Sequence, residues 1–219
     1  MRIGIFGGTF NPIHCGHLRS AEDVREAFSL DRVYFVPAAR PPHKSGEGLA
    51  PAAHRLRMVE LAIADNPCFA ASSIELERAG PSYSIDTIRY FLSVFRPAAL
   101  VFIVGIDAFR ELSSWKEYET IPALCDIVVT SRPGEENPAA AHLLPVALKD
   151  AFWYDSPTHM FKHRSGHFLT LRSINGLSIA SSTIRTMIQQ GRSIRYLVPI
   201  AVETYIDCHH LYQTEEILR

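Results

Sequence analysis

Short apolar runs alternate along the chain with segments in which apolar residues recur every three or four positions. The runs are typical of strands and the recurring segments of helices. Strands are predicted at 2–6, 32–37, 69–74, 100–105, 126–131 and 167–172. Helices are predicted at 16–29, 52–65, 85–95, 115–124, 139–148, 181–190 and 200–209. The segment 151–166 has no clear period, and no element is predicted there.

Several of the strands are apolar at almost every position, and 99–104 is the clearest case. Such strands are buried on both faces, as in a parallel sheet covered by helices. The alternation predicts an α/β protein with a doubly wound, Rossmann-like parallel sheet. We expect one domain over 1–219, with a small helical C-terminal part from about residue 179. Ligands of this fold class bind beyond the carboxyl ends of the strands.

Composition narrows the class of function. The chain has 219 residues and a formal net charge of -1, so a nucleic-acid partner, which needs a basic surface, is not expected. The N-terminal residues lack the pattern of a signal peptide, and the apolar runs are too short to span a bilayer. We therefore expect a cytoplasmic protein with no membrane partner. The four cysteines are widely separated and are interpreted as free thiols.

The first chemical feature is the joint between the first predicted strand and helix. Gly7 and Gly8 end the strand, Asn11-Pro12 marks a tight loop, and a helix starts near Gly16. A helix start offers unpaired N–H groups and a positive dipole end, which favour phosphate. The glycines match neither the dinucleotide fingerprint nor the P-loop, and an ordinary strand–turn–helix joint would also explain them.

His14 and His17 lie at the mouth of that helix, three positions apart. They could be a metal pair, but no nearby Asp, Glu or Cys completes a zinc set. Phosphate binding suits them better, because imidazole N–H groups stabilise the charge that develops in phosphoryl or nucleotidyl transfer. A second histidine series, His159, His163 and His167, is interrupted by Gly166, which makes a helical metal site there improbable. No metal ligands are predicted.

The stretch Gly7-Gly-Thr-Phe-Asn-Pro-Ile-His-Cys-Gly-His17 resembles the signature of the nucleotidylyltransferase superfamily, with its His-x-Gly-His core. Its extended form is similar to that of the bacterial nicotinate-nucleotide adenylyltransferases. Near the other end, Ile179-Ala-Ser-Ser-Thr-Ile-Arg185 resembles the family motif Ile-Ser-Ser-Thr-x-Ile-Arg. Here Ala180 replaces a serine and Ser182 stands where threonine is usual. Ser181 and Ser182 are expected to cap the helix, and Arg185 to face phosphate as a fixed cation.

Three more stretches resemble the family. Residues 37–44 match the loop after the second strand, where His43 and Lys44 would meet phosphate. Residues 82–87 match Ser-Tyr-Thr-x-Asp-Thr, whose backbone N–H groups would face the nicotinate carboxylate. Residues 105–115 match Gly-x-Asp…Leu-x-x-Trp, which would bring a carboxylate to a ribose and an indole ring to the pyridine. Read alone, these features would be a proline-rich loop, a helix cap and a core tryptophan.

The resemblance implies transfer of AMP from ATP to nicotinate mononucleotide, giving deamido-NAD and pyrophosphate. The cofactor would be Mg²⁺ carried with ATP. Catalytic roles would fall on His14, His17, Lys44 and Arg185. The ATP site would comprise Gly7, Gly8, Thr9, Phe10, His14, Gly16, His17, Gly105, Asp107, Ile179, Ser181, Ser182 and Arg185. The acceptor would be bound by Asn11, His43, Lys44, Tyr83, Ser84, Thr87, Trp115 and Lys116.

Alternatives stay open at this point. The acceptor could be nicotinamide mononucleotide or phosphopantetheine, with adenylyl or cytidylyl transfer. The chain could also be a nucleotide-binding sensor without turnover, although the intact histidines and Arg185 favour catalysis. An RNA-binding module is disfavoured by the near-neutral charge. A homo-oligomer is possible, since the sequence does not define the assembly.

Overall fold

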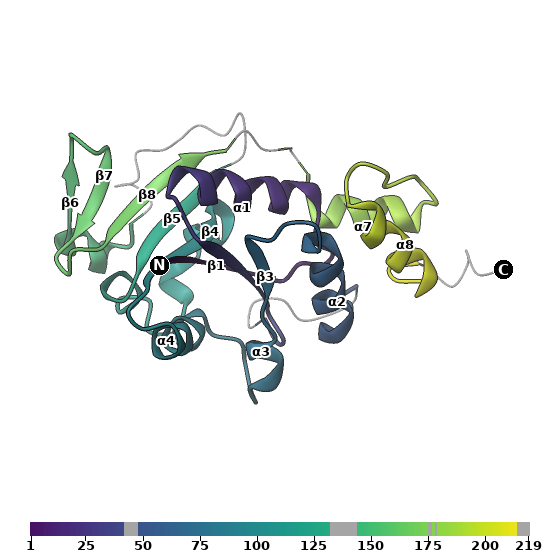
Figure 1. The fold of residues 1–219 in the computed structure, drawn as a ribbon, viewed down its shortest axis with the longest axis horizontal. Helices are drawn as coiled ribbons and strands as arrows, with labels where there is room; N and C mark the ends of the chain where they lie inside the picture. The colour runs from purple at the N-terminus through teal and green to yellow at the C-terminus, as the bar shows by residue number, and fades with distance from the viewer. Residues whose placement is uncertain (42–47, 132–143, 175–176, 178, 214–219) are drawn as a thin grey trace.

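A central sheet organises the computed structural model, which describes residues 1–41, 48–131, 144–174, 177 and 179–213. Its eight strands lie in the order β3-β2-β1-β4-β5-β8-β7-β6 (Figure 1). Their bounds are β1 Arg2–Gly8, β2 Arg32–Pro37, β3 Phe69–Ala71, β4 Ala99–Gly105, β5 Asp126–Ser131, β6 Phe152–Asp155, β7 Met160–His163 and β8 Phe168–Ser173. β1 to β5 and β8 pair in parallel, whereas β6 and β7 form an antiparallel hairpin at one edge.

Helices cover both faces of this sheet, so the predicted doubly wound α/β fold is confirmed. The α-helices are α1 Cys15–Ala27, α2 Ala52–Ile63, α3 Ile74–Glu77, α4 Ser84–Val94, α5 Ile106–Arg110, α7 Ser181–Gln189 and α8 Ile200–Cys208. Short 3₁₀ turns lie at Leu112–Ser114, Ile121–Ala123 and Val146–Ala151. No helix among these described residues is long and apolar enough to cross a membrane.

The strand residues divide between two apolar cores, one on each face of the sheet. Along β1, Ile3 and Ile5 pack with the core beneath α4, while Phe6 packs with the core beneath α1 and α2. β4 divides in the same way, with Phe102 on the first face and Ile103 on the second. Side chains of a strand alternate between faces, so burial on both faces produces the continuous apolar runs of the sequence.

The two C-terminal helices belong to the core on the α1–α2 face. Val202 and Ile206 of α8 are fully buried in the same cluster as Met58 and Val59 of α2. Figure 1 places α7 and α8 at the end of the molecule opposite the β6–β7 hairpin. The predicted helical C-terminal part is therefore present, and it packs against the α1–α2 face of the sheet.

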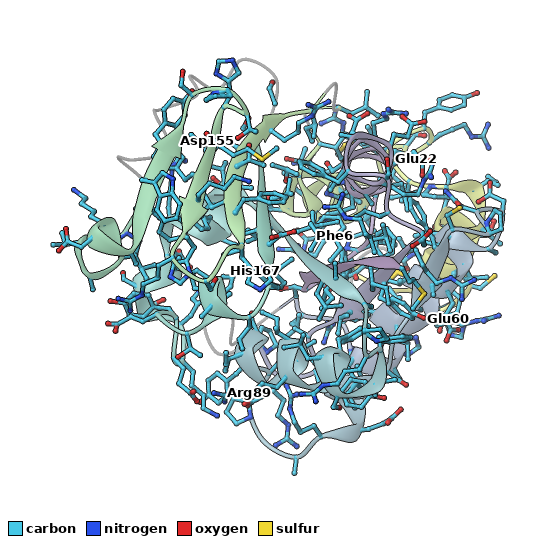
Figure 2. The ribbon with its side chains drawn as sticks, turned by 60° about the vertical axis from the view of Figure 1, so that its left-hand side comes forward. Phe6, Glu22, Glu60, Arg89, Asp155 and His167 are labelled. Carbon is cyan, nitrogen blue, oxygen red and sulfur yellow. The ribbon has the colours of Figure 1, made fainter. Side chains whose placement is uncertain are left out.

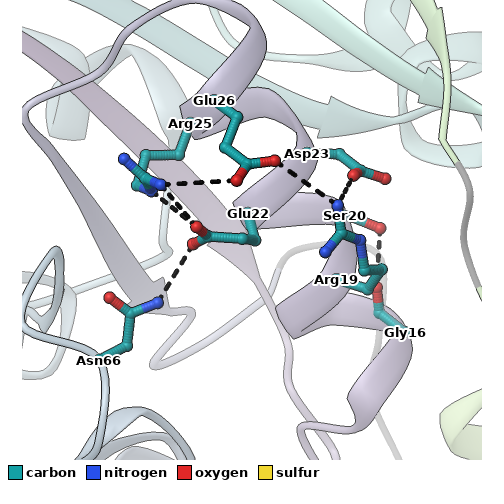
Figure 3. Close-up of polar contacts among 8 residues, drawn as sticks. All are labelled: Gly16, Arg19, Ser20, Glu22, Asp23, Arg25, Glu26 and Asn66. Carbon is teal, nitrogen blue, oxygen red and sulfur yellow. Dashed lines mark hydrogen bonds and ion pairs between the residues drawn. The ribbon is translucent and has the colours of Figure 1, made fainter.

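The outer face of α1 carries a polar network (Figure 3). The Arg25 guanidinium donates to Glu22 at 2.6 Å and lowers the pKa of that carboxyl, while Arg19 pairs with Asp23. Glu22 also accepts from Asn66 Nδ2 at 3.1 Å, which joins α1 to the turn before β3. Surface pairs of this kind contribute little to stability. Figure 2 shows Glu22 toward the outside of the molecule and Phe6 in its middle.

The helix predicted at 115–124 is wrong. The structure has successive turns there, closed by bonds between residues three apart, such as Thr120 N–H to Glu117 O at 2.9 Å. Glu117 adopts a left-handed backbone with φ of 51°, which an α-helix does not tolerate. Pro122 has no N–H to continue the helical ladder.

Three other segments differ from the prediction. The strand predicted at 69–74 ends at Ala71, and Ile74 begins α3. Of the helix predicted at 139–148, residues 139–143 lie outside the described residues, and a 3₁₀ turn follows the extended Pro145. The segment 151–166, for which no element was predicted, forms the β6–β7 hairpin. These elements are short, so their periodicity is too weak to recognise.

Candidate active site

A cavity of about 970 Å³ opens at the carboxyl ends of the parallel strands. It lies where the strand order reverses, because β1 has β2 on one side and β4 on the other. Its walls come from the loops after β1 and β4, the end of β5, and the first turns of α1, α4 and α7. The volume suits a nucleotide together with a second small substrate.

His14 and His17 cap the start of α1 reciprocally. His17 N–H donates to Nδ1 of His14 at 3.3 Å, and His14 N–H donates to Nδ1 of His17 at 3.2 Å. An imidazole nitrogen that accepts from a backbone N–H carries no hydrogen, so each neutral ring carries its proton on Nε2. The rings stack with centroids 3.6 Å apart, and both line the cavity. The pair thus presents two oriented N–H donors of the same kind.

Two glycines of the motif are required by close approach. A Cβ on Gly16 would lie 3.0 Å from Nδ1 of His14, and a Cβ on Gly8 would lie 3.0 Å from the ring of Phe10. Real Cβ atoms rarely approach a neighbour so closely, so a larger residue would displace these rings. The glycine in His-x-Gly-His is therefore explained by the ring of His14.

Phe10 fixes the second histidine from the apolar side. It is almost fully buried, and its ring meets the ring of His17 edge to face with centroids 5.1 Å apart. Its backbone is left-handed, with φ of 47°, which is unfavourable for a bulky residue. Such strain persists where the surrounding packing holds it, and it is common in loops that bind ligands.

The late motif reaches the same place from α7. Arg185 Nη1 donates to the carbonyl of Asn11 at 2.8 Å across 174 residues of sequence, and Ser181 Oγ donates to the carbonyl of Pro12 at 2.9 Å. Both side chains line the cavity. The helix cap is Ala180, so the predicted capping by Ser181 and Ser182 is wrong. Ser181 bonds to the loop after β1 instead, and that bond positions α7 against α1.

Another part of the cavity wall is aromatic and charged. Trp115 lies edge-on to Phe102, with centroids 6.1 Å apart, and Ser84 is the first residue of α4. Lys116 Nζ lies 4.9 Å from the ring centroid of Tyr83 and 3.2 Å from a carboxylate oxygen of Asp86. This wall offers a flat apolar face beside a helix N-terminus.

Most predicted site residues come together in this cavity. Those that line it are Gly7, Gly8, Thr9, Phe10, Asn11, His14, Gly16, His17, Tyr83, Ser84, Gly105, Asp107, Trp115, Lys116, Ile179, Ser181, Ser182 and Arg185. Thr87 is buried behind the wall and donates to Glu75, which does line it. His43 and Lys44 lie outside the described residues.

Sequence reasoning missed several lining residues. Glu75 comes from the short helix α3, Ser82 accepts from the backbone N–H of Ala39 at 3.0 Å, and Ser131 ends β5. For Ser131 a signal existed, because the carboxyl end of a buried parallel strand borders the ligand site. Ser82 begins the 82–87 motif but was not itself predicted to line the site, and no local signal in the sequence points Glu75 to the cavity.

The described part of the chain shows no group of three His, Cys, Asp or Glu side chains arranged to hold a metal ion. The three spaced histidines have separate partners. His159 bonds to Tyr154, His163 to Ser165, and His167 to Asp126 at 3.1 Å. The lining of the cavity contributes imidazole, hydroxyl and guanidinium groups, all of which can donate hydrogen bonds to phosphate oxygens.

Comparisons with known proteins point to one family. Residues 5–187 match the family model described as cytidylyltransferase-like. Proteins named probable nicotinate-nucleotide adenylyltransferase from Syntrophotalea carbinolica and Geotalea daltonii are 46% and 51% identical, over 97% or more of each chain. The fold is similar to that of the Plasmodium falciparum nicotinic acid mononucleotide adenylyltransferase complexed with NaAD. That structure gives a TM-score of 0.73 at 18% identity, covering 96% of this chain and 97% of that one.

Proposed function

The chain belongs to the cytidylyltransferase-like family and, within it, to the nicotinate-nucleotide adenylyltransferases, and we propose that it transfers AMP from ATP to nicotinate mononucleotide. The products are deamido-NAD and pyrophosphate. The observation that carries the proposal is one cavity whose lining includes His14, His17 and Arg185 together with Trp115 and the start of α4. One end suits phosphates and the other a flat, anionic ring.

The transfer is an in-line substitution at the α-phosphorus of ATP. A phosphate oxygen of the mononucleotide forms a new bond to this phosphorus, and the bond to the bridging oxygen of pyrophosphate breaks. His14 and His17 donate from Nε2 to the α- and β-phosphate oxygens, where negative charge builds up. Fixed donors of this kind stabilise the transition state more than the ground state, because they need no reorganisation.

No general base is needed for the attack. The second pKa of a phosphate monoester lies near 6, so the attacking group is largely ionised at neutral pH. Repulsion between the two anionic substrates is the main obstacle, and Arg185 reduces it with a charge that is permanent at physiological pH. Its bond to the Asn11 carbonyl keeps the guanidinium beside the loop after β1. We propose that Lys44 adds a second cation from the loop after β2.

The acceptor ring lies against Trp115, with its carboxylate toward the start of α4. The first N–H groups of this helix have no side-chain cap, and Tyr83 is the cap residue. The positive end of a helix favours an anion, so it distinguishes a carboxylate from a neutral amide. The Lys116 ammonium group lies beside this helix start, 4.9 Å from the Tyr83 ring centroid, and its ion pair with Asp86 offsets the negative charge of that carboxylate in the first turn.

We propose that the divalent ion is Mg²⁺ and that it enters with the triphosphate. Phosphate oxygens and water are the ligands that Mg²⁺ prefers. When bound, it neutralises charge on the leaving pyrophosphate. The imidazole and guanidinium donors at this end of the cavity then bind oxygens that the ion leaves available.

The assay supplies ATP, Mg²⁺ and nicotinate mononucleotide and measures pyrophosphate and deamido-NAD together. Both products should appear in equal amounts and should depend on both substrates. The matched control is H17A, with H159A as a histidine variant outside the cavity. A yield from the wild type no greater than that from H17A would contradict the proposal. Product formed only with phosphopantetheine would assign the chain to a different transferase.

A further inference from the structure

A fully buried arginine lies behind the loop after β1. Arg55 of α2 has an exposed fraction of 0%, and its three nitrogens donate to three backbone carbonyls. Nε donates to Ala50 at 2.9 Å, Nη1 to Thr9 at 2.7 Å, and Nη2 to Ala39 at 3.3 Å. These carbonyls belong to the segment before α2, the loop after β1 and the loop after β2. One side chain thus joins three segments that surround the cavity.

This burial is unfavourable for the charge itself. Desolvation lowers the pKa of Arg55, which shows that the charged form is less well solvated here than in water. The described residues give it no ion pair with a carboxylate, so carbonyl dipoles hold the guanidinium. A buried charge is retained only where hydrogen bonds compensate for lost water. The geometry that these bonds impose on the loops is therefore the evident consequence of placing arginine here.

Asn11 makes a second set of contacts to the same loops, and we call Arg55, Asn11 and Tyr212 together the hub. Its Nδ2 donates to the carbonyl of Gly48 at 2.8 Å, and its Oδ1 accepts from the N–H of Ala50 at 3.0 Å. The same Oδ1 accepts from the hydroxyl of Tyr212 at 2.8 Å, across 201 residues of sequence. The segment after α8 therefore returns to the loop after β1. Burial raises the pKa of Tyr212, so its hydroxyl stays protonated and able to donate.

The hub is adjacent to the groups that meet phosphate. Thr9 and Asn11 flank Phe10, whose ring packs against His17. The carbonyl of Asn11 accepts from Arg185. A shift of this loop would therefore move both an imidazole donor and the guanidinium. Neither Arg55 nor Tyr212 lines the cavity, so each acts only through the loop.

We propose that Arg55 and Tyr212 are positioning residues for ATP: together they hold Thr9, Phe10 and Asn11 in the conformation that binds its phosphates. The C-terminal segment is then part of the active site rather than only a cover over α2. The proposal rests on the proposed function for its rate measurements, and ATP affinity provides a readout that requires no acceptor.

The first test replaces Tyr212 by phenylalanine, which removes one hydroxyl and keeps the ring. The matched control is Y205F, since Tyr205 lies on α8, its hydroxyl bonds to His54 Nδ1 of α2 at 2.9 Å, and it does not line the cavity. For Y212F we expect ATP affinity, measured by calorimetry, and kcat to fall by about fivefold to tenfold, as for one lost hydrogen bond. KM for nicotinate mononucleotide should not change, and the melting temperature should match that of Y205F. Equal ATP affinities for Y212F and Y205F would overturn the proposal.

A double-mutant cycle separates positioning from general stability. In N11A the acceptor of the Tyr212 hydroxyl is absent, so Y212F in that background should cause no further loss of ATP affinity. If the two losses of ATP affinity multiply in the double variant, an action of Tyr212 through Asn11 is contradicted.

Arg55 is tested by R55K, which keeps the positive charge but cannot make all three hydrogen bonds in the same geometry. Its control is R57K, on the exposed face of α2. Weaker ATP binding in R55K alone would support the proposal, and equal binding in both would contradict it.

The two proposals fail in different ways. Wild-type protein that binds ATP but adenylylates no nicotinate mononucleotide would contradict the proposed function. The ATP affinities of Y212F and R55K would still test the positioning role of the hub. Active wild-type protein with indistinguishable Y212F and R55K variants would contradict the hub alone.

Discussion

The imidazole rings of His14 and His17 stack at 3.6 Å, and each Nδ1 accepts the backbone N–H of the other residue. The same contacts cap α1 and select the tautomer with hydrogen on Nε2. Helix capping and the proposed donation to phosphate therefore share one arrangement. This explains the spacing of the motif, because residues three apart at a helix start can cap each other.

Replacing these histidines should separate the two roles. H14S keeps a side-chain oxygen that can cap α1, so the free energy of unfolding should stay close to that of the wild type. H14A removes the cap and should cost about 1 kcal/mol. Both variants and H17A should lose about a hundredfold in kcat, the usual effect of removing one donor to a developing negative charge. Denaturant unfolding and steady-state kinetics measure the two effects.

The control for this series is H159A, which removes an exposed histidine of the β6–β7 turn. It should retain wild-type activity. An H14S variant with full activity would show that capping alone explains the histidine.

Gly16→Ala tests the close approach to His14. The added methyl would lie 3.0 Å from Nδ1, so the ring must move out of its stack. We expect kcat to fall by at least about tenfold, since a displaced donor loses much of its stabilising effect. Alanine favours a helix, which offsets the loss of the His14 cap when the ring moves, so the free energy of unfolding should change by no more than about 1 kcal/mol. Loss of activity with unchanged far-UV circular dichroism is the expected result, and wild-type kinetics would refute the steric explanation.

Trp115 and Trp153 provide a matched pair for the acceptor site. Trp115 lines the cavity, whereas Trp153 lies on the edge strand β6 with 55% of its surface exposed. W115L should raise KM for nicotinate mononucleotide by about tenfold, the loss expected for one ring stacked on an aromatic side chain. KM for ATP should change little. W153L should alter neither constant, and equal effects of both substitutions would argue against stacking.

His163 should make the free energy of unfolding decrease as the pH falls. Burial lowers its pKa, and the charges of Arg164 and His167 add to the shift. As pH falls through about 6.5, the unfolded chain protonates this residue while the folded protein resists protonation. The unfolded state then binds more protons, so stability decreases toward acid pH.

The measurement is the melting temperature between about pH 7.5 and pH 5.5 for wild type and H163N. Asparagine retains an acceptor for the N–H of Ser165, which now bonds to Nδ1 at 3.2 Å. Over this range the melting temperature of the wild type should fall further than that of H163N, because the unfolded chain gains a proton on His163 near pH 6.5 while the folded protein resists it. Identical slopes would show that His163 does not cause the loss.

The sequence predicted those parts of the fold that local patterns determine. The strands predicted at 32–37 and 126–131 have the bounds of β2 and β5, because their apolar residues are mostly buried and the runs end sharply. The helix predicted at 115–124 failed although Trp115, Tyr118 and Ile121 have helical spacing. That spacing also arises in successive turns. No feature of the neighbouring sequence indicates the left-handed backbone of Glu117.

The residues of the candidate site that lie in family motifs could be predicted from the sequence. The contacts between segments far apart in the sequence could not. The cap of α7 is Ala180 because Ser181 is bonded to Pro12, on a distant loop. Arg55 stands in a polar sequence, His54-Arg-Leu-Arg57, which suggests a solvated helix face. Only the three loops that fold over it make it the centre of a buried hub.

The central claim is adenylyl transfer to an acidic pyridine nucleotide, and competition between two acceptors tests it most directly. Equal concentrations of nicotinate and nicotinamide mononucleotide are incubated with limiting ATP and Mg²⁺, and the two dinucleotide products are separated and quantified. A carboxylate held by a helix N-terminus predicts at least about tenfold more deamido-NAD than NAD. Equal amounts of the two products, or neither product, would contradict the account.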